Sequence, residues 1–251
     1  MKNFKHKIRD LLILLTYYSG LPALKVWLCC CLKIPLLRVA AFHEIKDDEA
    51  GSFQEKLIFL KKKFNIISSV DFLASNFSND KVNLLLTFDD AFESWRKNVL
   101  PILKQENLSA VFFLDGRGLA LAGALRESGQ TIGGHTVGHK RLTKVLPSEM
   151  AFEIAENKKQ LEETAGQKIV FFAYPFGDKQ SFNQVVVDEV KKAGYQYGFT
   201  ILPGLNKLKT NHYLLHRDSI DVKWSKKFLK MWFYGAYDYW KSLLNFLGRG
   251  K

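Results

Sequence analysis

Continuously apolar segments alternate with segments of helical spacing through the middle of the chain. The apolar runs predict strands that are buried on both faces, and the longest are LLRVAAFHEI (36–45), VNLLLTF (82–88), SAVFFLD (109–115) and KIVFFAYP (168–175). Shorter strands are predicted at 65–70, 131–135, 195–200 and 212–220. Amphipathic spacing predicts helices at 51–64, 92–107, 116–129, 147–166 and 181–194. This alternation predicts an α/β fold with a parallel sheet covered by helices, either a barrel or a doubly wound sheet.

The two ends of the chain have a different pattern from the middle. We divide the sequence into an N-terminal helical appendage (1–37), a central domain (38–220) and an aromatic, basic C-terminal helix (221–251). The pattern of residues 1–37 predicts two short amphipathic helices that lie in a membrane interface. The alternatives are an anchor that spans the membrane and helices that dock on the protein's own core. The C-terminal segment suits either a membrane interface or packing on residues 60–73.

The charge and the cysteine content of the chain indicate which partners it contacts and in which compartment it lies. Lys plus Arg number 37 and Asp plus Glu 25, which gives a net charge of +12 and favours an anionic surface. The excess charge lies in apolar segments without a nucleic-acid-binding motif, so we expect peripheral membrane contact and no nucleic acid. The three cysteines, Cys29 to Cys31, are adjacent, which excludes a disulfide framework. Free thiols favour the cytoplasmic face of a membrane; an anchored chain with an exported central domain is the alternative.

Titratable residues recur where the predicted strands end. In a barrel these ends lie on one face, where active sites are found. His43 ends the first strand, two aspartates follow 82–88, two histidines follow 131–134, and His216 with Arg217 lie in the last strand. No Gly-x-Gly-x-x-Gly follows the first strand, so a dinucleotide site is not indicated.

A metal site is one explanation for this cluster. His135 and His139 are four residues apart, so on one helical turn both imidazoles would face the same side. Two imidazoles and one aspartate leave open positions on a metal, as in catalytic sites, with Zn²⁺ the first choice and Co, Ni, Mn or Fe as alternatives. Of the adjacent Asp89 and Asp90, one would bind the metal and the other would take a proton from water. The alternative is that this pair caps a helix beginning near Phe92.

Three short motifs, which follow one another along the chain, resemble the motifs of a known family. TFDD (87–90), HTVGH (135–139) and FFAYPFG (171–177) resemble the first three motifs of the polysaccharide deacetylase family, also known as NodB-homology or carbohydrate esterase family 4. AAFHEI (40–45) resembles the first strand of bacterial members, and FAYPFG is typical of one bacterial subgroup. The resemblance covers about residues 38–220. It implies a distorted (β/α) barrel and metal-dependent hydrolysis of an N-acetyl group.

The first two motifs imply roles by position. Asp89 matches the family's general base, and Asp90, His135 and His139 match its metal ligands. Thr136 matches the Ser or Thr that braces the metal loop by hydrogen bonding. Stabilisation of a tetrahedral oxyanion by a metal and an N–H group agrees with this assignment.

The third motif matches with one departure. Tyr174, Pro175 and Phe176 are expected to wall the substrate site, and the Phe176 N–H corresponds to an oxyanion donor. Many members have an arginine that orients the base where this chain has Ala173. Another cation must then do so, and Arg217 is the candidate.

Two further histidines each have two candidate roles. His216 falls where a late family motif supplies a general acid, although YLLHRD matches that motif only loosely; a strand-end histidine paired with Asp218 is the alternative. His43 is expected either to line the substrate site or to be a core imidazole.

The expected activity is hydrolytic removal of an N-acetyl group from an N-acetylhexosamine in a polysaccharide, oligosaccharide or lipid-linked glycan. Two alternatives stay open: a hydrolase of another non-peptide amide on the same fold, and a non-catalytic glycan-binding protein.

Overall fold

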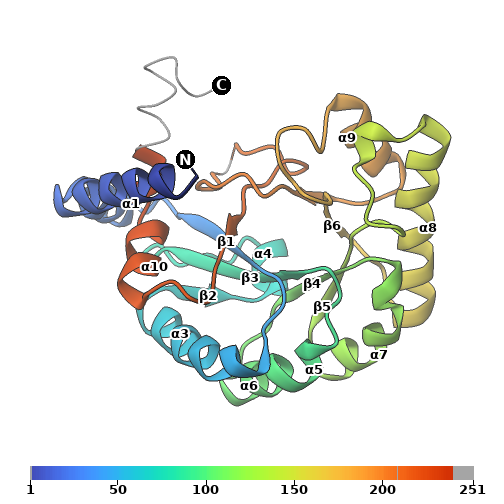
Figure 1. Ribbon diagram of the computed structural model, residues 1–251, viewed down its shortest axis with the longest axis horizontal. Helices are drawn as coiled ribbons and strands as arrows, with labels where there is room; N and C mark the ends of the chain where they lie inside the picture. The colour runs from blue at the N-terminus through green and yellow to red at the C-terminus, as the bar shows by residue number, and fades with distance from the viewer. Residues whose placement is uncertain (1, 208, 240–251) are drawn as a thin grey trace.

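The computed structural model describes residues 2–207 and 209–239, and its strands form one curled sheet (Figure 1). The strands follow the order β7-β6-β5-β4-β3-β1-β8, with β2 paired to β3 off this path, and the paired strands are parallel. Their bounds are β1 Leu37–Phe42, β2 Asn65–Ile67, β3 Asn83–Asp89, β4 Val111–Leu114, β5 Thr131–Gly134, β6 Phe171–Ala173, β7 Tyr197–Phe199 and β8 Asp218–Ser219. The predicted (β/α) barrel is confirmed in a distorted, half-open form, because β7 and the segment before β8 are joined by an isolated bridge between Phe199 and Leu215 rather than by a regular ladder.

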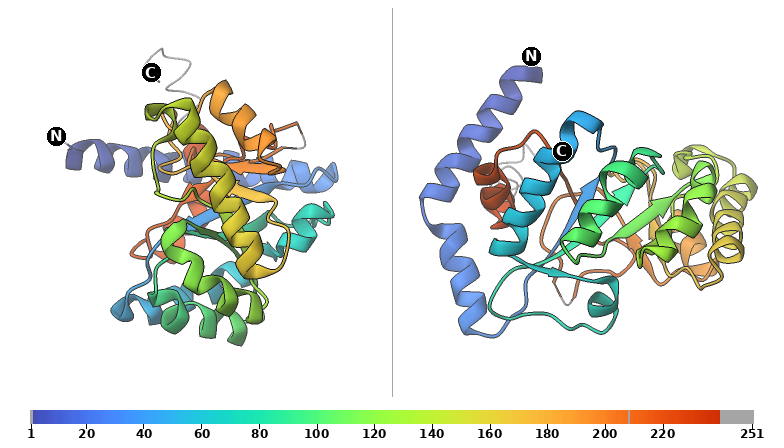
Figure 2. Two further views of the ribbon diagram at one scale, coloured as in Figure 1. Left: turned by 90° about the vertical axis from the view of Figure 1, so that its right-hand side faces the viewer. Right: turned by 90° about the horizontal axis from the view of Figure 1, so that it is seen from below.

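Helices cover the outside of the curl (Figures 1 and 2). Their bounds are α1 Lys2–Tyr18, α2 Leu21–Cys31, α3 Ala50–Lys63, α4 Ser69–Leu73, α5 Ser94–Asn98, α6 Leu100–Gln105, α7 Leu119–Glu127, α8 Pro147–Ala165, α9 Gln184–Lys192 and α10 Lys226–Phe233.

Two predicted elements are shorter than their sequence pattern indicated. The single helix expected at 92–107 is wrong, because the chain breaks between α5 and α6 beside Pro101, which lacks an N–H group and clashes with a preceding helical turn. The strand expected at 65–70 ends at Ile67, because Ser68 caps α4 by accepting a hydrogen bond from the Asp71 N–H.

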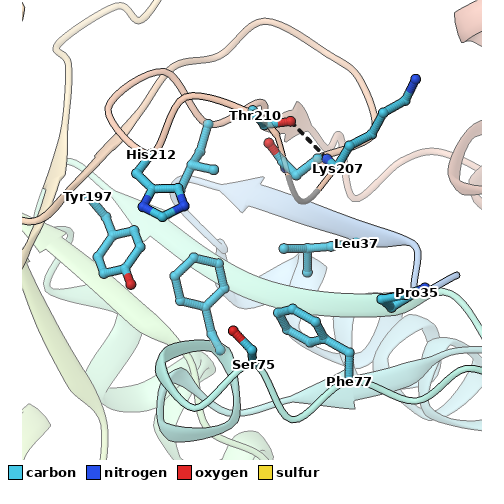
Figure 3. Close-up of a pocket in the computed structure, with 11 residues that line it drawn as sticks. Pro35, Leu37, Ser75, Phe77, Tyr197, Lys207, Thr210 and His212 are labelled. Carbon is cyan, nitrogen blue, oxygen red and sulfur yellow. Dashed lines mark hydrogen bonds between the residues drawn. The ribbon is translucent and has the colours of Figure 1, made fainter.

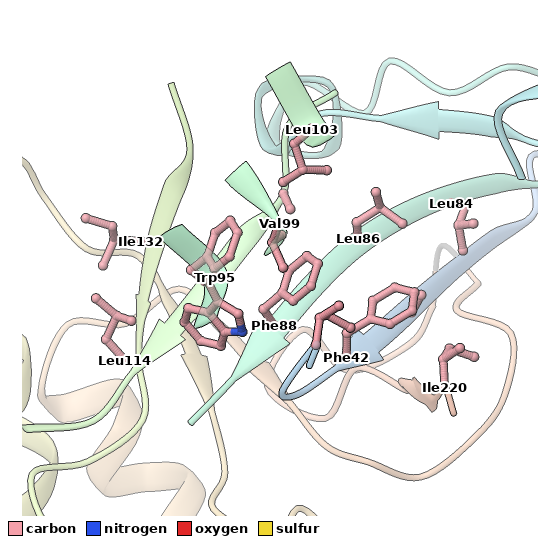
Figure 4. Packing of buried hydrophobic residues seen from close by; sticks show 14 of the residues in the cluster. Phe42, Leu84, Leu86, Phe88, Trp95, Val99, Leu103, Leu114, Ile132 and Ile220 are labelled. Atoms are coloured by element: carbon pink, nitrogen blue, oxygen red, sulfur yellow. The ribbon is translucent and has the colours of Figure 1, made fainter. Parts of the chain in front are cut away.

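Alternation along the strands separates two apolar cores. In β3, Leu84, Leu86 and Phe88 point outward and pack under the helices with Trp95 (Figure 4). Leu85 points inward, into a smaller core inside the curl. Because side chains alternate along a strand, Thr87 and Asp89 share the inward direction of Leu85. The strand pattern therefore directs Asp89 into the mouth of the barrel.

The predicted N-terminal helices are present as α1 and α2, separated at Gly20, whose φ is +76°. In the described part of the chain, no single helix has both the length and the apolar character needed to cross a membrane. Ile8–Tyr18 and Leu21–Cys31 meet that test only as a pair, bent by 52° at the break. Ile13 is buried in the main core, whereas Leu15 on α1 and Trp27 on α2 are 58% and 60% exposed. One side of the pair therefore docks on the protein and another faces outward.

The C-terminal helix packs on the protein. The apolar side of α10 is buried, and Phe233 packs edge-to-face against Phe64 at the end of α3, with ring centroids 5.6 Å apart. Arg38 in β1 forms a buried ion pair with Asp218, which also accepts a hydrogen bond from Trp232 Nε1. Of the two interpretations of this segment, packing on residues 60–73 is the correct one for α10, and the membrane-interface interpretation is wrong there. Residues 240–251 of the predicted C-terminal helix lie outside the described residues.

Candidate metal centre and active site

Side chains from the ends of separate strands meet in one cavity of about 200 Å³. Because the strands are parallel, their C-terminal ends lie at the same end of the curl, and residues far apart in sequence converge there. The lining residues are His43, Asp89, Asp90, His135, His139, Tyr174, Phe176, Ile201 and Arg217.

Asp90, His135 and His139 form the tightest group in this cavity. One potential ligand atom from each lies within 4.8 Å of the others. The Nε2 atoms of His139 and His135 are 3.0 and 3.3 Å from Asp90 Oδ1. His135 Nδ1 is 2.7 Å from the Ala173 carbonyl oxygen. With Nδ1 donating to that carbonyl oxygen, Nε2 is the nitrogen directed toward Asp90 and available to a metal.

The electrostatics of the group agree with a cation site. Burial alone would raise the pKa of Asp90, but hydrogen bonds with His135 and His139 hold that pKa far below its usual range. The hydrogen bond with Asp90 raises the pKa of His139 in turn. A carboxylate and two imidazoles are a donor set that fits a divalent metal with open positions, so the triad is consistent with one.

The histidines do not lie on a helical turn, so the helical geometry predicted for them is wrong. They belong to an irregular loop in which Thr136 and His139 have φ values of +66° and +52°. The imidazoles converge through these left-handed residues, with ring centroids 4.9 Å apart.

Helix α8 holds this loop through two residues that sequence reasoning missed. Glu153 Oε2 accepts a hydrogen bond of 2.6 Å from the Gly138 N–H, and Asn157 Oδ1 accepts one of 3.0 Å from the His135 N–H. Both side chains are buried. The sequence carries a signal for them, because Glu153 and Asn157 interrupt the apolar side of α8 at helical spacing from Met150.

Thr136 does not brace the loop in the expected way. Its side chain is fully buried, and its hydroxyl oxygen has no hydrogen-bond partner among the described residues. Hydrogen bonding by this hydroxyl is therefore a wrong expectation, since Glu153 and Asn157 bond to the loop's backbone instead.

Asp89 forms a buried, two-point ion pair with Arg217. Arg217 donates from its two terminal nitrogens to both carboxylate oxygens, each at 2.6 Å. The side chains are 5% and 1% exposed. Burial would raise the pKa of Asp89, but the charge and hydrogen bonds of Arg217, together with the nearby His135 and His43, outweigh burial and lower that pKa. Arg217 Nε also donates to the Thr200 carbonyl oxygen, at 2.9 Å, which fixes the guanidinium plane. Arg217 is therefore the cation beside Asp89 in a chain that has Ala173 in place of an arginine.

The helix-cap explanation for the aspartate pair is wrong. Asp90 has a φ of +81°, and α5 begins at Ser94 with Glu93 as its N-cap residue and no side-chain cap hydrogen bond. Backbone strain instead gathers at the site. Of the eight described non-glycine residues with positive φ, five belong to the site loops: Asp90, Ala91, Thr136, His139 and Phe176. Such strain is typical of functional sites, where the surrounding structure fixes the conformation.

The third motif borders the cavity through two of its three predicted residues. Tyr174 and Phe176 line the cavity, and Pro175, although buried, does not. The Phe176 ring is 51% exposed, lies 5.0 Å from the His139 ring, and is covered by the Arg141 guanidinium at 4.6 Å. Arg141 makes a two-point contact with Asp178, with its nearer oxygen at 2.6 Å. This ion pair holds the loop that carries Phe176 against the metal-site loop.

The structure brings His43 to the site but not His216. His43 lines the cavity, and its carbonyl oxygen accepts a hydrogen bond of 3.0 Å from Trp95 Nε1. His216 is absent from the lining and lies against Gly204, with its backbone bonded to Asn206. Neighbouring residues of an extended segment point to opposite sides, so Arg217 and His216 cannot both face the cavity. The placement of His216 at the site is therefore wrong.

A second cavity of about 100 Å³ lies at the opposite ends of the strands (Figure 3). It is lined at the start of β1 by Leu37 and at the start of β7 by Tyr197, whose ring stacks on His212 at 5.3 Å. Its position separates it from the aspartates and histidines of the candidate site.

Comparison with known proteins agrees with the motifs. Residues 78–198 match the family model described as "Polysaccharide deacetylase". A similar curated protein is "Putative polysaccharide deacetylase YxkH" of Bacillus subtilis (strain 168), 29% identical over 142 residues, or 53% of this chain and 50% of that protein. A segment 29% identical over 107 residues, 41% of this chain, matches 18% of a "Bifunctional xylanase/deacetylase" of Pseudobutyrivibrio xylanivorans. The chain thus matches half or less of the length of these relatives.

Solved structures share the fold. The Streptococcus pyogenes deacetylase PplD, in complex with acetate, aligns with a TM-score of 0.69 and 20% identity, over 80% of this chain and 99% of that one. IcaB from Ammonifex degensii aligns with a TM-score of 0.67 and 21% identity, over 80% and 98%. Because these identities are low, the likeness establishes the architecture, while the matched segment 78–198 contains TFDD, HTVGH and FFAYPFG in order. Residues 78–198, just under half of the chain, therefore match the polysaccharide deacetylase family, and the fold agrees with that match.

Proposed function

We propose that the protein is a metal-dependent hydrolase that removes the acetyl group from an N-acetylhexosamine of a polysaccharide, oligosaccharide or lipid-linked glycan. The observation that carries this proposal is the pairing of Asp89 with Arg217 beside the Asp90–His135–His139 group in one cavity. A carboxylate fixed next to a candidate cation site is the arrangement needed to take a proton from attacking water. The family match supports the reaction class.

In this proposal Asp90, His135 and His139 hold the metal. When bound, a divalent cation such as Zn²⁺ supplies Lewis-acid chemistry, lowering the pKa of water and polarising the amide carbonyl. Co, Ni, Mn and Fe suit the same donor set.

Residues of the chain itself then accept the proton of water and stabilise the negative charge that develops on the carbonyl oxygen. Asp89 receives the proton of the attacking water while Arg217 holds both of its oxygens in place. The Phe176 N–H, which makes no hydrogen bond within the described chain, is the candidate donor to the carbonyl oxygen as negative charge develops there. Tyr174 and Phe176 wall the acetyl group.

The leaving amine needs a proton, and we assign its donor to His43. Of the three imidazoles that line the cavity, His135 and His139 belong to the metal group, which leaves His43. Replacement of His43 by glutamine should lower acetate release from N-acetylated oligosaccharides by about 10²–10⁴-fold. The matched change in His216 should leave the rate near that of the wild type. Release from p-nitroacetanilide, whose leaving group needs less protonation, should fall less in the His43 variant. Equal losses on both substrates would contradict an acid role for His43.

The reaction itself is tested by acetate release from a panel of amides. The metal-loaded chain should release acetate from N-acetylhexosamine oligosaccharides faster than from acetylated amines without a sugar. Preference for a non-sugar amide would favour the alternative, a hydrolase of another C–N bond. Retention of Asp90, His135 and His139 disfavours the third reading, a protein that only binds glycans.

We also propose peripheral membrane contact through the outward side of α1 and α2, with residues 38–220 as the catalytic domain. The supporting observation is a set of large apolar side chains on these two helices, each between 44% and 62% exposed: Leu11, Leu15, Tyr18, Leu21, Leu24, Trp27 and Leu28. The net charge of +12 suits an anionic bilayer. Sedimentation with phosphatidylcholine/phosphatidylglycerol vesicles at low salt tests this, with Leu15→Glu/Trp27→Glu as the variant expected to stay in the supernatant. Equal sedimentation of the variant, or none of the wild type, would contradict it.

A further inference from the structure

An open groove of about 470 Å³ lies next to the candidate active site. It is lined by Arg9, Ile201, Pro203, Ser219, Ile220, Asp221, Trp224 and Trp232. Ile201 lines both this groove and the active-site cavity, so the two spaces adjoin. The Ile201 N–H donates to the Gly177 carbonyl oxygen at 2.8 Å, which ties this shared wall to the loop that carries Phe176.

The groove is built by parts of the chain outside the family match. Its lining residues come from α1, from 201–203 and from 219–232, whereas the family model ends at residue 198. Helix α1 contacts α10 across this region (Figures 1 and 2). The two terminal segments therefore extend the active-site face of this chain.

The aromatic wall of the groove is held rigidly. Trp232 is 5% exposed, its Nε1 donates to Asp218 at 2.8 Å, and its ring stacks on Tyr237 with centroids 4.3 Å apart. The half-buried Trp224 ring packs 4.9 Å from Trp232. A pre-ordered wall loses little conformational entropy when a ligand binds.

Polar groups edge this wall. The Arg9 guanidinium lies 6.0 Å from the Trp232 ring centroid and is partly exposed. Ser219 and Asp221 are exposed at the same groove, and Asp221 accepts a hydrogen bond from the Lys223 N–H with one oxygen.

We propose that this groove binds the sugar residues that flank the acetylated hexosamine, so that the preferred substrate is an oligosaccharide rather than a single sugar. A pyranose ring presents an apolar C–H face, which suits Trp224, and a rim of hydroxyls, which suits Arg9, Ser219 and Asp221. A hydrocarbon chain would instead remove water from the Asp221 carboxylate and from the Arg9 guanidinium, which pairs with Asp10, and would give neither a new hydrogen bond. The inference takes its ligand class from the proposed deacetylase function.

The test compares ligand length with and without the aromatic wall. The probes are N-acetylglucosamine and its β-1,4- and β-1,6-linked dimers to tetramers. Binding is measured by calorimetry on the full-length chain with chelator present, and acetate release is measured on the metal-loaded chain. The variants are Trp224→Ala, Trp224→Phe and Asp221→Asn, with Phe152→Ala as a control, since Phe152 is an exposed aromatic residue on α8 that does not line the groove.

The wild type should bind a tetramer at least tenfold more tightly than the monosaccharide. Trp224→Ala should weaken binding of the tetramer and raise the KM for the tetramer by about tenfold, equivalent to about 1.4 kcal/mol. The affinity and KM for the monosaccharide should stay unchanged. Trp224→Phe should lose less of this affinity. Asp221→Asn should weaken tetramer binding without altering the fold, and Phe152→Ala should match the wild type.

Two outcomes separate the groove from the proposed reaction. The groove proposal alone would be overturned if acetate release did not depend on the length of the oligosaccharide. It would also be overturned if Trp224→Ala lost the same fraction of activity on the monosaccharide and on the tetramer. Length-dependent and Trp224-dependent binding without acetate release would refute the deacetylase function and support the groove as a glycan site.

Discussion

Replacement of Arg217 by methionine should leave a buried carboxylate without its cation. The Asp89 side chain is 5% exposed and accepts two hydrogen bonds of 2.6 Å from Arg217. Removal of one partner of a buried pair costs about 3–5 kcal/mol. Because Asp89 borders the cavity and can regain some water, we expect about 3 kcal/mol, near the lower limit of that range. For a chain of this length that loss corresponds to a fall in Tm of roughly 6–12 °C.

Arg141 offers a matched control for this prediction. It also makes a two-point contact with a carboxylate, Asp178, but the two side chains are 25% and 47% exposed. Exposed pairs contribute less than about 1 kcal/mol, so Arg141→Met should unfold in urea near the wild-type midpoint. The contrast between the two arginine variants isolates burial from hydrogen-bond geometry.

A double-mutant cycle measures the interaction directly. Asp89→Asn removes the charge that Arg217 compensates, so the double variant Asp89→Asn/Arg217→Met should be more stable than the sum of the single losses predicts. Arg217→Lys keeps the positive charge but loses the two-point hydrogen bonding of the guanidinium. Its rate of acetate release should lie between those of the wild type and Arg217→Met. If Arg217→Met loses under about 1 kcal/mol and keeps full activity, Arg217 neither stabilises nor positions Asp89.

Two further predictions concern the site loops. Glu153→Ala removes the carboxylate that holds the metal-site loop, and metal affinity measured by titration should fall about 10–100-fold; unchanged affinity would show that the loop holds itself. Arg141 lowers the pKa of Asp178 to about 2 from 3.8, so the stabilisation is present above the unfolded pKa and is lost as pH falls through about 2. Because Asp178 is half exposed, the effect should stay below about 1 kcal/mol, and the acid limb of Tm against pH should be shallower in Asp178→Asn; an identical acid limb would contradict it.

The direction of the main site residues follows from the strand pattern. Leu85, Thr87 and Asp89 share one side of β3, and that side faces the inner core. The same parity gives Leu215 and Arg217 one direction and His216 the other. The sequence therefore contained the information to choose Arg217 over His216 for the cavity, once a strand had been assigned through both.

Loop geometry was beyond the reach of the sequence pattern. A spacing of four between His135 and His139 is compatible with a helix, but the loop adopts left-handed backbone at Thr136 and His139. These conformations are fixed by contacts from α8, which lies later in the chain. Short-range patterns do not contain such tertiary contacts, although the buried positions of Glu153 and Asn157 indicate that α8 has a polar partner.

The C-terminal helix is a second feature whose environment the sequence pattern alone could not decide. An amphipathic helix with aromatic and basic residues fits a bilayer and a protein surface equally well by composition. The choice depends on a matching apolar surface, which Phe64 and α3 provide for Phe233. On α1 and α2, by contrast, several large apolar side chains remain exposed, and these helices carry the membrane proposal.

The central claim is that Asp90, His135 and His139 hold the metal while Asp89 takes the proton. The most direct test is the metal content and chelator-sensitive acetate release of wild type, Asp89→Asn and His135→Ala. We predict wild-type metal content without acetate release in Asp89→Asn, and loss of both in His135→Ala. Full acetate release by Asp89→Asn, or wild-type metal content in His135→Ala, would contradict the account.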